Sequence, residues 1–369
     1  MNFSEPGGSR HVYLLSLVLA LAYLLIILYA SVQPFRGWRL PAHDVYSFLS
    51  APWPRYITLI DVSINVCAYI PLGFMLTLGL RLALPVVAAV AAGVVLAFGV
   101  SVAMESIQMF LPARIASNVD VLANSAGGLI GALAAPLFQP ARGLGKRLST
   151  WRNRLFLPGA MTDIGIVVIG LWIVTHLNPL TQVFSTGNLR QTFDLPVYFF
   201  HTPGLFLFAE FAVVGLNLLG IGLLLSTLMR AHVHRRWVIA AAILAALSFK
   251  MVISGVSGKP LGPWAWVTPG ALLGVCAGGG LLMLLIGLGH TVRLLCAMIS
   301  FVIALAAINL APDNPYFSLP PQLASGRLSH FLSFSAILRA LSELWPIIAI
   351  SYLCTAAWRS WRYGNAAET

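Results

Sequence analysis

The chain has 369 residues, of which 59% are apolar and only 9% are charged. A water-soluble domain usually carries about 25% charged residues, so most of the surface of this protein cannot face water. The net charge of +11 does not indicate nucleic acid as a partner, because the basic residues lie between apolar runs and form no continuous stripe. The composition excludes a soluble enzyme and predicts a protein that is embedded in the lipid bilayer.

Ten apolar segments, bounded by charges, prolines and polar connections, follow one another along the chain. Each is close to the roughly 20 residues that cross a bilayer, and lipid offers backbone groups no partner outside a helix. The segments cover residues 11–31, 59–80, 84–111, 119–138, 161–178, 204–229, 237–254, 269–290, 292–311 and 340–358. We therefore predict an all-α, polytopic bundle of about ten transmembrane helices.

The Lys and Arg residues between these segments indicate an orientation. If the N-terminus is cytoplasmic, thirteen of them fall on the inner side and eight on the outer side. The inner side then holds both dense clusters, one around Lys146 and Arg147 and one around Arg235 and Arg236. Because basic connections stay in the cytoplasm, we expect both termini there.

The first basic cluster also divides the chain. We expect a four-helix membrane domain at residues 1–140, a basic cytoplasmic loop at 141–160 and a six-helix membrane region at 161–369.

Ionisable and amide side chains inside the predicted spans are concentrated in the second, third and fourth segments. A carboxylate at the bilayer centre costs about 2.5–3.5 kcal/mol on insertion scales, so such residues are candidates for function or for buried pairing. They form three pairs spaced three or four residues apart, which places each pair on one helical face. The pairs are Asp61 with Asn65, Glu105 with Gln108, and Asp120 with Asn124.

The alternating direction of the helices brings these three pairs to one depth. The second segment begins with its pair, the third ends with its pair, and the fourth begins with its pair. Arg114 lies in the short connection above them, and its planar guanidinium suits carboxylate or phosphate. We predict a polar, outward-facing pocket that binds a ligand. The alternative is that these side chains only lock the bundle through hydrogen bonds between helices.

The same residues carry a resemblance to a known family. Asn65, the run YIPLGF at 69–74, the run ESIQMFLPAR at 105–114 and the run DVLANSAGG at 120–128 together resemble the VanZ-like family over roughly residues 10–140. Five residues match the motif of this family position by position: Glu105, Gln108, Arg114, Asp120 and Asn124. The resemblance implies a bacterial inner-membrane protein of the cell envelope. The family's namesake is associated with low-level teicoplanin resistance, and no settled biochemical activity comes with the family.

Glycines follow the polar pair of the fourth segment. Gly127 and Gly131 are four residues apart, a spacing that predicts close packing of one helix against another. The second half carries faint echoes of this part of the chain, at 217–220 for the second segment and at 269–274 for the fourth. A degenerate parallel repeat is therefore one hypothesis, although similar composition alone makes apolar helices look alike.

Three functions stay open on these observations. The first is binding of a lipid-linked envelope ligand, with a link to glycopeptide resistance or envelope polysaccharide metabolism. The second is a membrane enzyme in which two carboxylates act as acid and base on a lipid-linked phosphate or sugar. The third is a transporter or flippase, which needs polar residues on both sides of the membrane. No second polar cluster is apparent in the second half, where Glu210 and Lys250 are isolated, and these two are hypothesised to form a buried pair.

Neither a metal nor a cofactor is expected. The four cysteines lie in apolar segments without metal-ligand spacing, and no nucleotide-binding or serine-hydrolase motif is present.

Overall fold

The structure is a computed structural model. It describes residues 6–32, 37–41, 43–54, 57, 59–112, 114–140, 143–178, 181–190, 202–256, 262–264, 266–311 and 329–364. Within these ranges the secondary structure is helical, with one isolated β-bridge between Phe156 and Met229 and no strand. Every one of the ten predicted segments is a helix, so the all-α bundle is confirmed.

Eight of the described helices are long and apolar enough to cross a membrane. The other two predicted segments form shorter apolar helices of 16 and 17 residues. At 1.5 Å per residue these measure roughly 24–26 Å, slightly less than the hydrocarbon core of a typical bilayer.

Contacts divide the chain into two units, which are described separately. Unit 1 comprises residues 1–152 and 325–337, and unit 2 comprises residues 153–324 and 338–369. The helices of unit 1 are α1 (Pro6–Val32), α2 (Leu59–Leu80), α3 (Val86–Gln108) and α4 (Asn118–Ala134), with short helices η1 (Ser47–Ser50) and η2 (Ala135–Phe138). Helix α5 (Gly143–Leu155) includes the point in the sequence where unit 1 ends and unit 2 begins.

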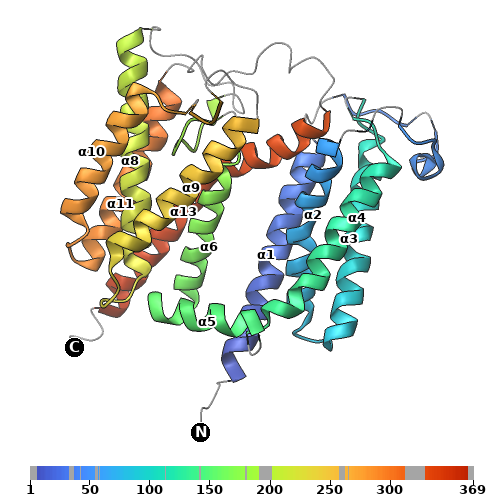
Figure 1. The fold of residues 1–369 in the computed structure, drawn as a ribbon, viewed down its shortest axis with the longest axis horizontal. Coiled ribbons are helices and arrows are strands. Elements are labelled where there is room, and N and C mark those ends of the chain that lie inside the picture. Colours follow the sequence, from blue (N-terminus) through green and yellow to red (C-terminus); the bar gives the residue numbers. More distant parts are fainter. Residues whose placement is uncertain are drawn as a thin grey trace. The chain divides into compact units, whose positions relative to one another are not determined.

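In unit 1 the helices α1 to α4 stand side by side (Figure 1), and α2 packs most extensively on α4. Helices α2 and α4 can approach closely because glycines of α4 face the backbone of α2. A Cβ atom on Gly127 would collide with the carbonyl oxygen of Val66, and one on Gly131 would collide with that of Ile70. The close packing predicted from the glycine spacing is confirmed.

The basic connection at 141–160, predicted as a cytoplasmic loop, contains the helix α5. Leu144, Leu148 and Trp151 are four and three residues apart and are all exposed. They lie on one face of a helix whose other positions carry Lys146 and Arg147. Amphipathic character explains why this basic segment is helical.

Unit 2 is built around α8 (Pro203–Leu228), whose second half is buried along its length. Helices α10 (Pro269–Leu285) and α11 (His290–Leu310) pack most extensively on α8. The unit also contains α6 (Ala160–Thr175), α9 (Arg235–Val256), η3 (Gly262–Trp264) and most of α13 (Ser329–Gly364). Aromatic contacts stabilise its core: Trp172 stacks on Phe184 at 5.6 Å, and Phe301 meets Trp345 edge-on at 5.2 Å.

The α8–α10 pair repeats the interlock of α2 with α4. Gly274 and Gly278 of α10 face the carbonyl oxygens of Phe211 and Gly215 in α8. In both pairs, two glycines four residues apart meet two carbonyls four residues apart. This shared arrangement supports the hypothesis of a parallel repeat.

Lys250 of α9 is 1% exposed, and its ammonium donates to the backbone carbonyls of Asn178, at 2.8 Å, and Thr181. Glu210 of α8 instead accepts a hydrogen bond from the hydroxyl of Thr268. The hypothesised Lys250–Glu210 pair is therefore not formed. The physical reason is that the non-helical segment after α6 brings carbonyl acceptors to the depth of the lysine.

Candidate functional site

The start of α4 is held by a carboxylate from α3. Ser117 is the N-cap of α4, and its hydroxyl accepts a hydrogen bond from the Val119 amide at 3.2 Å. The Ser117 amide in turn donates to Glu105 Oε2 at 3.0 Å. Glu105 is only 4% exposed, so this carboxylate is buried where the end of α3 meets the beginning of α4. A negative charge is favourable at a helix N-terminus, where amide groups lack intrahelical partners.

A second carboxylate connects α4 to α2. Asn65 donates from Nδ2 to Asp120 Oδ1 at 2.8 Å. Asp120 is 7% exposed and lies in the first turn of α4, close enough to Glu105 for the two carboxylates to interact electrostatically. Three helices therefore contribute to one polar cluster.

One turn deeper, an amide side chain joins α4 to α3. Asn124 Nδ2 donates to the hydroxyl of Ser101 at 3.0 Å. The hydroxyl of Tyr69 from α2 lies near that of Ser101. The carbonyl oxygen Oδ1 of Asn124 is buried and has no hydrogen-bond partner among the residues that the structure describes. A buried acceptor without a partner is costly and is an open position for a donor.

Arg114 lies in the connection between α3 and α4 and is half-buried. Its guanidinium donates to the carbonyl oxygen of Ala30, at the end of α1, at 2.9 Å. Burial lowers the pKa of Arg114 from its ordinary value, and the nearby Glu105 carboxylate opposes that shift. The arginine side chain stays protonated in proteins, so Arg114 is a fixed positive charge near the Glu105 carboxylate.

The polar cluster defined here comprises Asn65, Glu105, Arg114, Asp120 and Asn124, all predicted from the sequence. The other two predicted residues lie farther along their helices. Asp61 is in the first turn of α2, Gln108 is the last residue of α3, and both are half-buried.

Two residues at this site, Ser117 in the hydrogen-bond network and Tyr69 next to it, were not predicted. Ser117 is three residues before Asp120, a spacing typical of a helix N-cap. Tyr69 is four residues after Asn65 and so continues its helical face. Both signals were present in the sequence, but an uncharged hydroxyl costs much less within an apolar run than a carboxylate does, so it is a weaker indication of a site.

The cluster offers two buried carboxylates, one buried amide acceptor and one arginine within a single end of unit 1. These groups can accept hydrogen bonds from hydroxyl or amine groups and can donate to a phosphate. No group of three or more His, Cys, Asp or Glu side chains that could hold a metal occurs in the part of the chain that the structure describes.

The fold defines a multi-pass membrane protein. Its unit 1 has helices packed closely through glycines and carries the polar cluster at one end. Residues 14–139, in the N-terminal part of the chain, match the family model described as VanZ/LLP1. The matched range contains every residue of the polar cluster. No curated protein and no solved structure gives a significant match to the chain.

Proposed function

We propose that the VanZ-type part of this protein binds the polar head of a lipid-linked component of the bacterial cell envelope. The observation that carries this proposal is the convergence of Asn65, Glu105 and Asp120 from three helices onto one buried cluster. Helix locking alone needs only a few neutral hydrogen bonds, which contribute little in membranes, whereas two neighbouring carboxylates repel each other. Two carboxylates placed this close together are better explained if they bind a ligand.

The chemistry of the cluster suits a sugar joined to a phosphate. Glu105 and Asp120 can accept hydrogen bonds from sugar hydroxyls, and the unpartnered Oδ1 of Asn124 offers a third acceptor. Arg114 can donate to a phosphate with its planar guanidinium. The apolar tail of such a ligand would stay in the bilayer beside the exposed surfaces of the helices.

The proposal places the protein in the bacterial inner membrane with both termini in the cytoplasm. The polar cluster then faces the external leaflet, where lipid-linked cell-wall precursors are used. In cells this binding would affect glycopeptide resistance or envelope polysaccharide metabolism.

Binding can be measured with the full chain reconstituted in lipid nanodiscs and a polyprenyl-diphosphate-linked sugar as the probe. Glu105→Gln and Asp120→Asn should each weaken binding about tenfold or more, since each replaces a carboxyl oxygen with an amide nitrogen that cannot accept a hydrogen bond. Ser106→Ala and Ser125→Ala are matched controls, because each of these hydroxyls bonds only to the backbone carbonyl four residues earlier in its own helix.

Two results would redirect the proposal. Wild-type binding in both carboxylate variants, with normal membrane expression, would leave helix locking as the role of the cluster. Release of a cleaved sugar or phosphate from the probe would assign an enzymatic activity instead, and movement of the probe between leaflets would assign transport.

A further inference from the structure

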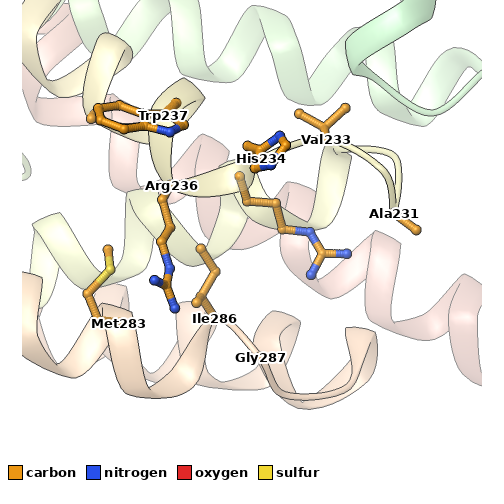
Figure 2. A pocket seen from close by; sticks show the side chains of 10 residues that line it. Ala231, Val233, His234, Arg236, Trp237, Met283, Ile286 and Gly287 are labelled. Carbon is orange, nitrogen blue, oxygen red and sulfur yellow. The ribbon is translucent and has the colours of Figure 1, made fainter.

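A pocket of about 700 Å³ opens in unit 2, where the turn between α8 and α9 meets the end of α10. Figure 2 shows its two walls. One wall is the beginning of α9 with the turn before it, and the other is the last part of α10 together with the residues that follow. The pocket is formed entirely by residues of unit 2.

The α9 wall is cationic. It contributes His234, Arg235 and Arg236, and none of the residues that line the pocket, all of them described, is acidic. The Nε atom of Arg235 is buried and has no hydrogen-bond partner among the described residues. The N-terminus of the 22-residue helix α9 adds the positive end of its dipole. These features favour an anion, and adjacent guanidinium groups are suited to phosphate.

The rest of the pocket lining carries no charge and is largely apolar, and part of it is exposed. Trp237 is 76% exposed and Met283 is 42% exposed, and Ile286 lines the pocket beside Met283. In Figure 2 the side chain of Arg236 extends from α9 between Met283 and Ile286 of the opposite wall. A cationic site with exposed apolar walls fits a molecule that has an anionic head and an apolar tail.

The position of the pocket along α9 indicates where such a molecule comes from. The stretch of α9 that is long and apolar enough to cross a membrane begins at Arg235. The arginines therefore lie at the depth of the lipid head groups, while Trp237 and Met283 border the acyl chains. Anionic phospholipids are the amphiphiles that a bilayer supplies at this depth.

We propose that this pocket binds an anionic glycerophospholipid of the surrounding bilayer. The lipid phosphate lies between the guanidinium groups of Arg235 and Arg236, and an acyl chain follows the surface of Trp237 and Met283. This site depends on no part of the ligand site proposed for unit 1.

Native mass spectrometry of the full chain, purified in a neutral detergent and titrated with phosphatidylglycerol or phosphatidylcholine, tests the proposal. The wild-type protein should retain phosphatidylglycerol in preference to phosphatidylcholine. Arg235→Gln with Arg236→Gln should reduce the affinity for phosphatidylglycerol about tenfold or more. The matched control is Arg359→Gln with Arg362→Gln, which removes the same charge from the exposed end of α13 and should change the affinity less than about twofold.

Two further variants keep the test decisive if the double variant does not fold. Arg236→Gln changes an exposed side chain and should weaken phosphatidylglycerol binding by itself. Ala240→Trp fills the pocket without changing its charge and should also weaken binding. Wild-type preference in these variants, an equal loss in the α13 control, or equal retention of the two lipids by the wild-type protein would overturn the proposal. Saturable binding of inorganic phosphate that prevents lipid retention would also overturn it, because the site would then belong to a free anion.

Discussion

Asn65 and Asp120 are 55 positions apart in the chain, yet Asn65 Nδ2 lies 2.8 Å from Asp120 Oδ1. This hydrogen bond crosses the α2–α4 interface, the tightest helix pair of unit 1. It joins the first turn of α4 to the second turn of α2. The bond therefore links the polar cluster to the helix pair that holds the unit together.

A double-mutant cycle measures that link. Asn65→Leu and Asp120→Leu should each lower the free energy of unfolding, and their coupling should be about 1 kcal/mol, within the range found for hydrogen bonds between membrane helices. The measurement is denaturant unfolding of the full chain in micelles. Ser125→Ala, which loses only a local bond, is the control. Strictly additive single variants would show that the two side chains do not stabilise one another.

Glycine packing between α2 and α4 allows a comparison of two identical substitutions. Gly127→Ala places a Cβ atom against the carbonyl oxygen of Val66, so the helices must separate and the protein should lose about 2 kcal/mol of stability or more. Gly99→Ala in α3 adds a Cβ atom to open space and should be neutral or stabilise by up to about 1 kcal/mol. Thermal unfolding of both variants in detergent is the measurement. Similar melting temperatures for the two would contradict the close approach of the backbones.

Lys250 should stabilise unit 2. Lys250→Met leaves the carbonyl oxygens of Asn178 and Thr181 without this donor, in a region where water is scarce. The expected loss is about 1–3 kcal/mol of unfolding free energy. Ser248→Ala on the same helix removes an exposed hydroxyl that bonds only within α9, so it should change stability by less than about 0.5 kcal/mol. No loss in Lys250→Met would mean that other groups satisfy these carbonyls.

The proposed orientation predicts which side of the membrane each unit 1 connection faces. Single cysteines can replace Ile115, which is 79% exposed beside Arg114, and Arg147, which is exposed on α5. A membrane-impermeant thiol reagent added to intact cells should label position 115 and should label position 147 only after lysis. The background for both is a variant with alanine at all four native cysteines: Cys67, Cys276, Cys296 and Cys354. The reverse pattern would place the polar cluster on the cytoplasmic side.

Much of the architecture could be predicted from the residues alone. Lipid cannot hydrogen-bond to the backbone, so each long apolar run had to be a helix, and all ten predicted segments are helical. Each polar pair contributes at least one residue to the same end of unit 1, because helices in series reverse direction, which needs no knowledge of packing. The spacing of Gly127 and Gly131 likewise predicted a close interface without naming its partner.

The partners themselves were decided by tertiary structure. Spacing put Glu105 and Asp120 at one end of the bundle, but the rotation and register of the helices determined that Glu105 bonds the Ser117 amide and Asp120 bonds Asn65. Lys250 met backbone carbonyls instead of Glu210 because a non-helical segment, which has no periodicity to read, reaches its depth. The pocket in unit 2 is lined by Arg236 of α9 and Met283 of α10, which are distant in the sequence. Local sequence sets which face of a helix is polar, whereas the choice of neighbour depends on contacts between residues that are distant in the chain.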